Sequence, residues 1–209
     1  MPIKLPEIKG GWATVLCDPP WRFSQGLSSS PKVRGGAEKY YATMSDAEII
    51  GLPVGEILAA DAQVYCWATN AHLHRAFHCL ESWGLEYKTC FTWVKGSVGG
   101  GSRPYATLML QIGLGYWARG ASEHMLLGVR GNPRAKFTGP NGATGLGIST
   151  VILAPRQAHS QKPDESYRVI EAISEEPRLE IFARRRRQGW TAFGDQVEGE
   201  VQTVLRPEN

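Results

Sequence analysis

Short apolar segments rich in β-branched and aromatic residues alternate along this chain with segments whose apolar residues recur at helical spacing. The former have the length and composition of buried strands, and they are Ala13–Cys17, Gln63–Ala68, Thr89–Val94, Glu123–Val129, Thr150–Leu153 and Arg178–Ala183. The latter predict helices over Ser45–Ile50, Val54–Ala60, Ala71–Trp83 and Pro163–Ser174. Strands that alternate with helices predict an α/β fold, with a mostly parallel sheet and helices on both of its faces.

Two of the predicted helices carry end signals. Gly84 stops the helix that begins at Ala71. Pro163 suits the first position of its helix, because proline has no backbone N–H and none is needed there. Asp164 and Glu165 follow in the first turn, where the helix dipole favours acidic side chains.

The length of 209 residues predicts a single domain over residues 1–209, which buries roughly 70% of the surface that its unfolded chain exposes. No stretch reaches the run of about 20 apolar residues that a bilayer span requires. The N-terminal segment also lacks the apolar core of a signal peptide. We therefore expect a soluble, cytoplasmic protein with no membrane partner.

Neither cysteines nor histidines form a recognised metal-binding pattern. The four cysteines contain no CxxC pair, so reduced thiols are expected at Cys17, Cys66, Cys79 and Cys90. His74 and His78 have the spacing of some metal-binding pairs, but no carboxylate completes a known motif. We expect no metal site.

Three long stretches rich in Gly, Ser, Pro and Arg are not typical of regular structure, and they are Ser24–Lys39, Gly96–Gly120 and Gly131–Gly147. Loops of this length in a domain are often functional lids or disordered segments. The net charge of +3 is small, but Arg184–Arg187 form an unbroken basic block. Such a block is either a solvated face or a contact for the phosphates of a nucleic acid.

The motif Asp18-Pro19-Pro20-Trp21 follows the first predicted strand, and ligands of open α/β sheets bind outside the carboxyl ends of strands. The Asp18 carboxylate and the Pro19 carbonyl can each accept one hydrogen from the N6 amine of adenine. That grip stabilises the positive charge that grows on nitrogen as a methyl group arrives. Pro20 stiffens the turn, and Trp21 can stack on an unstacked base, worth about 1–3 kcal/mol. The alternative is a plain turn with a buried tryptophan.

Blocks along nearly the whole chain resemble the MT-A70 adenine-N6 methyltransferases, and they occur in that family's order. They are Leu16–Trp21, Ala37–Ser45, Val64–Thr69, Trp83–Lys88, Thr92–Gly96, Gly113–Trp117, Glu123–His124, Gly128–Pro133, His159–Glu165, Leu179–Arg184, Gly189–Trp190 and Gly194–Gln196. The resemblance implies a Rossmann-like methyltransferase domain with a permuted motif order, in which the catalytic loop comes first and much of the cofactor site comes last. The strand that ends before Arg184 would then lie beside Asp18.

The resemblance also implies the cofactor, S-adenosyl-L-methionine, and the residues that bind it. The catalytic motif contributes Asp18, and the remaining cofactor contacts implied are Lys162, Glu180, Arg184, Asp195 and Gln196. Lys162 can pair with the methionine carboxylate, and Glu180 can accept hydrogen bonds from hydroxyl groups. The family often has asparagine at the position of Asp195, which is a departure in this chain.

Two loops border the substrate in the family, and here they span Arg22–Met44 and Pro155–Lys162. Besides Trp21, the substrate contacts implied are Tyr41, Arg156, His159 and Ser160. Closure of such loops excludes water from the reacting groups.

The sequence thus predicts transfer of a methyl group to adenine N6 in a nucleic acid, with DNA favoured and RNA as the alternative. A second hypothesis is a catalytically silent scaffold that binds nucleic acid on the same fold. The intact Asp-Pro-Pro-Trp motif argues against it, since silent members of the family have a degraded motif. The resemblance makes Gly96–Gly120 a candidate partner interface, so we expect a monomer or a homodimer.

Overall fold

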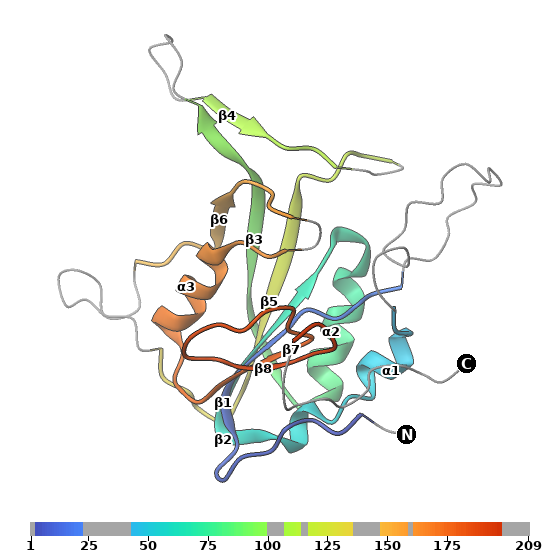
Figure 1. Ribbon diagram of the computed structural model, residues 1–209, viewed down its shortest axis with the longest axis vertical. Coiled ribbons are helices and arrows are strands. Elements are labelled where there is room, and N and C mark those ends of the chain that lie inside the picture. The colour runs from blue at the N-terminus through green and yellow to red at the C-terminus, as the bar shows by residue number, and fades with distance from the viewer. Residues whose placement is uncertain are drawn as a thin grey trace.

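A computed structural model of the protein describes residues 3–22, 43–99, 107–113, 117–135, 147–158 and 161–197 (Figure 1). Its strands are β1 Trp12–Cys17, β2 Leu58–Ala68, β3 Glu86–Gly99, β4 Thr107–Leu110, β5 Ser122–Arg130, β6 Val151–Ala154, β7 Arg178–Ile181 and β8 Thr191–Phe193. Its helices are α1 Asp46–Ile50, α2 Leu73–Ser82 and α3 Asp164–Ile173, with the short 3-10 turns η2 Val54–Glu56 and η3 Asn70–His72.

The strands form one sheet in the order β4-β3-β5-β2-β1-β7-β8, and β6 pairs with β3 outside this path. β1 therefore lies between β2 and β7, although β7 is more than 160 residues away in the chain. The pairing of β1 with β7 is parallel, and it sets Cys17 opposite Ile181. β7 thus lies beside β1, the strand that ends directly before Asp18, as the resemblance implied.

The sheet is mixed, so the prediction of a mostly parallel sheet is not confirmed. In the described part of the chain, β1–β2, β1–β7, β7–β8 and β3–β6 pair in parallel, whereas β2–β5, β3–β5 and β3–β4 are antiparallel. Parallel pairing of successive strands needs a crossover, usually a helix. The sequence between β3 and β5 has no helical periodicity to form one, and the chain returns antiparallel.

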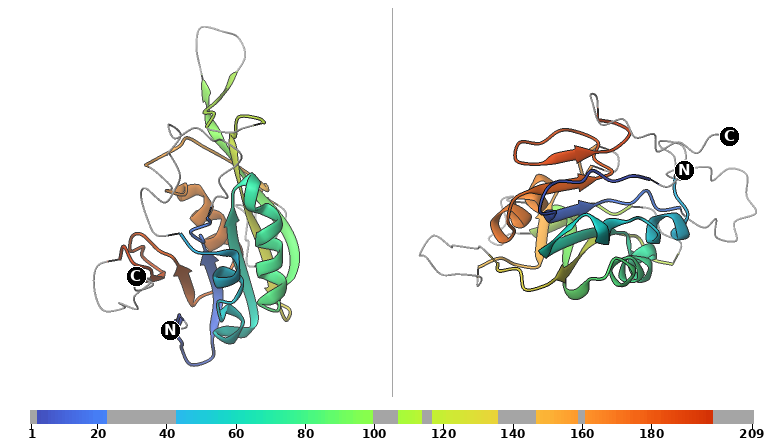
Figure 2. Two further views of the ribbon diagram at one scale, coloured as in Figure 1. Left: turned by 90° about the vertical axis from the view of Figure 1, so that its right-hand side faces the viewer. Right: turned by 90° about the horizontal axis from the view of Figure 1, so that it is seen from below.

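Side chains of successive strand residues enter two separate apolar clusters, because they point to opposite faces of the sheet. Val15 and Cys17 belong to one cluster, and Leu16 between them belongs to the other. Leu80 of α2 packs in the first cluster, and Ile170 of α3 packs in the second. In both views of Figure 2, α3 lies apart from α1 and α2, which contact each other.

The predicted helix over Val54–Ala60 is wrong. Only the turn η2 forms there, and β2 begins at Leu58. Leu58 pairs with Trp12 of β1, whose backbone N–H donates to the Ile57 carbonyl at 2.8 Å. Pairing with β1 therefore outweighs a weak local preference for helix.

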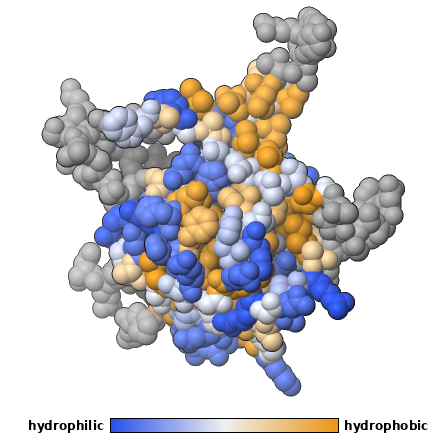
Figure 3. Space-filling view, turned by 180° about the vertical axis from the view of Figure 1, so that it is seen from behind, coloured by the Kyte–Doolittle hydropathy of each residue, from blue (hydrophilic) through white to orange (hydrophobic). Residues whose placement is uncertain are grey.

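The Gly96–Gly120 segment, for which no regular structure was predicted, contains part of a hairpin. β3 continues to Gly99 and pairs antiparallel with β4. The hairpin projects from the rest of the molecule in Figure 1, and apolar residues gather on it in Figure 3. More than half of the residue surface is exposed at Val98, Leu108 and Met109.

The remaining predicted helices form, with small changes at their ends. α1 has a full capping box, in which the Ser45 side chain accepts from the Glu48 backbone N–H while Glu48 accepts from the Ser45 N–H. Pro163 is the N-cap of α3 and not its first helical residue, because its ψ of 145° is extended. β8 was not predicted, since three residues carry no readable periodicity. Among the described residues, none of the helices is both long and apolar enough to span a bilayer.

Candidate active site

The turn after β1 is held by backbone hydrogen bonds on both of its sides. The Asp18 N–H approaches the Ile181 carbonyl of β7 at 3.5 Å, and the Met44 N–H donates to the Pro20 carbonyl at 2.9 Å. The Trp21 N–H donates to the Pro19 carbonyl at 2.8 Å. A carbonyl oxygen has two lone pairs, so Pro19 keeps one for another donor. The motif is thus a rigid turn at the carboxyl end of β1.

Trp21 is an anchor of this turn. Its indole N–H donates to the Trp67 carbonyl at 2.9 Å, and its ring stacks on His72 with centroids 5.5 Å apart and planes at 11°. Only 5% of Trp21 is exposed, so in this structure the ring offers little surface to a base. The stacking of a substrate base on Trp21 stays a prediction.

A chain of four alternating charges begins at Asp18. The Lys162 Nζ lies 2.9 Å from Asp18 Oδ1 and 3.1 Å from Glu123 Oε2. The other oxygen of Glu123 lies 2.6 Å from Lys95 Nζ. The side chains of all four are at most 18% exposed. Because β1, β5, β3 and the segment before α3 each supply one member, only the assembled sheet brings the four together.

Burial and charge act in opposite directions on these groups. The pKa of the Asp18 carboxyl lies above its usual value, chiefly because the group is buried. The charge of Glu123 also raises this pKa, whereas Lys162 and Arg184 lower it. Burial also raises the pKa of Glu123, but Lys162 and Lys95 lower it by more, to about 2. Burial lowers the pKa of Lys162, but Asp18 and Glu123 outweigh it and raise that pKa above its usual range. Glu123 and Lys162 therefore stay charged at neutral pH.

Glu180 on β7 is a second buried carboxyl at the same end of the sheet, 7% exposed. The Tyr167 hydroxyl on α3 donates to Glu180 Oε1 at 2.7 Å. The pKa of Glu180 is raised to about 7, chiefly by burial and also by the charge of Asp18, against the effect of this hydrogen bond. Because Asp18 influences Glu180, the two carboxyls lie within electrostatic reach of each other.

The basic block Arg184–Arg187 is partly paired within the protein. Arg185 lies 2.5 Å from the Asp164 carboxylate, which Arg187 also contacts, and the Arg187 guanidinium lies 3.9 Å from the centre of the Tyr167 ring. The charges of Arg185 and Arg187 are therefore shared with Asp164, and are less available to phosphates than the sequence suggested.

Asp195 and Gln196 follow β8 and are exposed. Gly194 brings this segment against the end of β7, since a Cβ there would stand 2.2 Å from the Ala183 carbonyl oxygen. None of the contacts among the described residues joins Asp195 or Gln196 to Asp18. The structure thus places them next to the segment that carries Arg184, but outside the charge chain.

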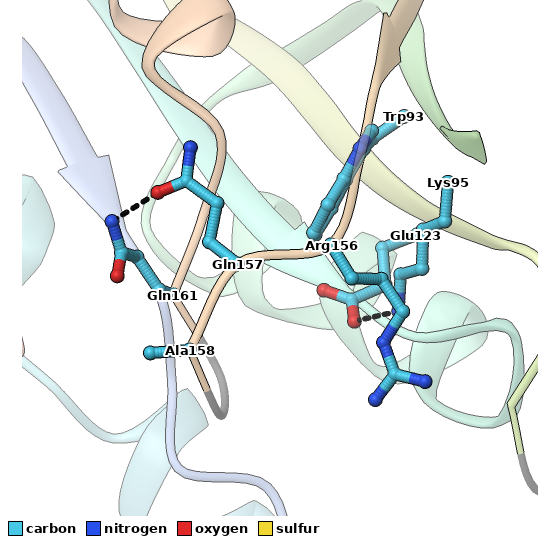
Figure 4. A pocket seen from close by; sticks show the side chains of 7 residues that line it. All are labelled: Trp93, Lys95, Glu123, Arg156, Gln157, Ala158 and Gln161. Carbon is cyan, nitrogen blue, oxygen red and sulfur yellow. Dashed lines mark hydrogen bonds and ion pairs between the residues drawn. The ribbon is translucent and has the colours of Figure 1, made fainter. Parts of the chain in front are cut away.

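Arg156 lies at a pocket of about 120 Å³, whose lining residues are Trp93, Lys95, Glu123, Arg156, Gln157, Ala158 and Gln161 (Figure 4). The backbone N–H of Arg156 donates to the Gln111 side chain at 2.6 Å. Glu123 and Lys95 belong both to this pocket and to the charge chain, so the pocket adjoins the charge chain that begins at Asp18. The predicted substrate residues Tyr41, His159 and Ser160 lie outside the described residues.

Sequence reasoning assigned no role to Glu123, Lys95 or Tyr167. Glu123 and Lys95 each stand at the end of an apolar run, where a charged side chain usually reaches solvent. Only their burial in the folded protein shows that they belong to the site. Among the residues that the structure describes, no group of three or more His, Cys, Asp or Glu side chains is arranged to hold a metal ion.

Glu180→Gln is expected to make the free energy of unfolding less dependent on pH. The pKa of Glu180 is raised from 4.5 in the unfolded chain to about 7, so the folded protein holds a proton that the unfolded chain releases between these values. Wild type therefore loses stability as pH rises through this window, by up to about 3 kcal/mol for one such group. Urea unfolding of both proteins at about pH 5 and pH 8 measures the difference. Exposed Glu86→Gln is the control, and an unchanged pH dependence in Glu180→Gln would contradict the assignment.

Comparison with known proteins gives one consistent result. The MT-A70 family model matches residues 12–196. The chain is 30% identical over 197 residues to a probable N(6)-adenosine-methyltransferase MT-A70-like protein of rice, covering 92% of this chain and 24% of that protein. It is 29% identical over 196 residues to METTL3, the human N(6)-adenosine-methyltransferase catalytic subunit, covering 92% and 29%. It is 25% identical over 213 residues to the type II methyltransferase M.MunI of a Mycoplasma species, covering 93% and 80%. The chain spans only about a quarter of the length of the first two relatives.

Proposed function

Since this chain belongs to the MT-A70 family, we propose that it is an S-adenosylmethionine-dependent methyltransferase that methylates N6 of adenine in a nucleic acid. One observation carries the proposal. The Asp18 carboxylate stands at the carboxyl end of β1, paired with buried Lys162 and beside the strand that carries Glu180. We further propose that the chain forms one Rossmann-like domain, with α3 covering the sheet face opposite to α1 and α2.

The described residues fit the cofactor by their chemistry. Lys162 is a buried cation suited to the methionine carboxylate, and Glu180 is a buried acceptor suited to a hydroxyl group. Arg184, Asp195 and Gln196 follow the neighbouring strands β7 and β8, and they complete the proposed binding set. When bound, the cofactor supplies an activated methyl group next to these residues.

Asp18 and Pro19 position the amino group that receives the methyl. The ionised carboxylate and the remaining lone pair of the Pro19 carbonyl accept the two N6 hydrogens, which aims the nitrogen and stabilises its developing charge. Trp21 and Pro20 hold the turn rigid, so little reorganisation is needed. Arg156, with Tyr41, His159 and Ser160, forms the proposed substrate border, and a duplex substrate would present its adenine flipped out.

DNA is the polymer we favour. The matched region makes up 80% of the type II methyltransferase M.MunI, so most of that enzyme corresponds to this chain. In the rice and human relatives, most of the protein lies outside the match. RNA is the second candidate, because those relatives are named for adenosine methylation and are the more similar in sequence.

Transfer of label from S-adenosylmethionine carrying a radioactive methyl group tests the proposal on single- and double-stranded DNA and RNA of one adenine-containing sequence. We expect label in N6-methyladenine, with higher incorporation into DNA than into RNA. Higher incorporation into RNA would reverse the choice of polymer. Binding of cofactor without incorporation into any of the four substrates would contradict methylation of nucleic acid. A calorimetric titration that detects no binding of cofactor would favour the silent scaffold.

A further inference from the structure

Lys162 has two carboxylate partners where the proposed chemistry needs only one. Its Nζ lies 2.9 Å from Asp18 and 3.1 Å from Glu123, and it stands 5.4 Å from the centre of the Trp67 ring. Only 10% of the Lys162 side chain is exposed. An ammonium in such a place needs a counter-charge, because leaving one partner of a buried pair alone is strongly destabilising.

The proposed hydrogen bond to the substrate amine gives Asp18 a second partner that competes with Lys162. The carboxylate that pairs with Lys162 must also accept a hydrogen bond from adenine N6. Lys162 pairs with Oδ1 of this carboxylate, so a rotation that aims the carboxylate at the amine weakens that pairing. If Asp18 were the sole partner of Lys162 within the protein, turning toward the substrate would leave the methionine carboxylate of the cofactor as the only counter-charge of a buried ammonium.

We propose that Glu123 is a positioning residue that keeps Lys162 neutralised while Asp18 turns to the substrate amine, and that Lys95 holds Glu123 in place for this task. The inference rests on the proposed methyl transfer. Glu123 acts through Lys162 and not on the substrate, and Lys95 acts through Glu123. No proton is transferred in this step, and only the hydrogen-bond partners of Lys162 change.

The geometry of Glu123 suits this role. It uses a different oxygen for each lysine, with Oε1 toward Lys95 at 2.6 Å and Oε2 toward Lys162 at 3.1 Å. Both lysines are therefore held at once, and Glu123 has no need to move when Asp18 does. Lys95 also lies 4.9 Å from the centre of the Trp93 ring, which restrains it from the other side. The low pKa of Glu123, about 2, keeps it ionised throughout the range of an enzyme assay.

The charge of Glu123 also acts on Asp18, which gives the inference a pH signature. The titratable and charged groups around the two carboxyls come from every neighbouring element and are Cys17, Lys95, His124, Lys162, Tyr167, Glu180 and Arg184. Within this set Glu123 raises the pKa of Asp18. Replacing Glu123 by a neutral isostere should therefore lower the pKa of Asp18 and tighten its pairing with Lys162.

Glu123→Gln tests this directly. We expect kcat to fall about tenfold or more, while KM for the nucleic acid changes little. The acid limb of the pH profile should move to lower pH, because Asp18 stays ionised further into acid. Glu123→Asp retains the charge and should leave that limb near its wild-type position. Lys88→Met is the control, because Lys88 pairs with Glu86 on the exposed surface of β3, the strand that carries Lys95, and should change neither quantity.

Two results separate a positioning role from a merely structural one. The double variant Glu123→Gln with Lys95→Met restores the neutral charge of the cluster, but it still leaves Asp18 as the sole carboxylate of the protein on Lys162. It should therefore stay as slow as Glu123→Gln, and recovery of wild-type kcat in the double variant would overturn the inference. An unmoved acid limb in Glu123→Gln would overturn it as well.

A readout without turnover keeps this inference distinct from the proposed function. Titration of the Asp18 carboxyl by carbon-13 NMR, in the protein without cofactor, should show a lower pKa in Glu123→Gln than in wild type. If wild type methylates no nucleic acid, the proposed function fails whatever this titration shows. If wild type is active but the Asp18 titration and kcat are both unchanged in Glu123→Gln, only the role of Glu123 is refuted. If Glu123→Gln does not fold, Glu123→Asp is used in its place, and its kcat should exceed that of Lys162→Met.

Discussion

Asp18→Ala is expected to lower the rate of methyl transfer at least about 10²-fold while cofactor affinity falls little. The variant loses the carboxylate that aims the N6 amine and stabilises its developing charge. Methyl transfer in single turnover, together with calorimetric titration of S-adenosylmethionine, measures the two effects separately.

The fold should tolerate this change, because Glu123 still pairs with Lys162 when Asp18 is absent. Removal of Asp18 also relieves the burial of a carboxylate whose pKa is raised chiefly by that burial. Glu81→Ala is the control, since its carboxylate pairs with His78 on the exposed surface of α2. A rate within a few-fold of wild type in Asp18→Ala would refute the role of the motif.

Lys162→Met is expected to have the largest effect on stability, lowering the free energy of unfolding by about 3–5 kcal/mol at neutral pH. The substitution removes the cation that Asp18 and Glu123 share, and it does so in a largely buried site. Cofactor affinity should fall about tenfold or more, because a charge-assisted hydrogen bond to the methionine carboxylate is lost. Urea unfolding and calorimetric titration are the measurements, and a loss of stability below about 1 kcal/mol would contradict burial of the pair.

The stability deficit of Lys162→Met should also grow as pH rises. In wild type Lys162 lowers the pKa of Asp18, against the raising effect of burial. Without Lys162 the folded-state pKa of Asp18 is higher, and a carboxyl with a raised pKa costs stability as pH rises through that pKa. At about pH 5 Asp18 can take up a proton and the deficit shrinks, whereas at about pH 8 it persists. Lys162→Arg retains a cation and should show a smaller deficit at both values.

Local sequence was sufficient where neighbouring residues carry the whole signal. The start of α1 after Ser45, the stop at Gly84 and the turn after β1 all depend on side chains and backbone atoms a few residues apart. Such short-range preferences are present in the chain before it folds. The order of motifs along the chain was equally readable, and it led to the family that the comparisons show.

The assembled sheet was needed wherever the partners are distant in sequence. β2 starts earlier than its local pattern indicated because β1 pairs with it, and β5 runs antiparallel because no helix carries the chain back. Glu123 and Lys95 were missed for the same reason. Their charges meet Lys162 and Asp18 only after β1, β3, β5 and the segment before α3 have come together in the fold. Charges attract through space and without regard to chain order, so a pattern along the sequence cannot reveal which of them burial will bring into contact.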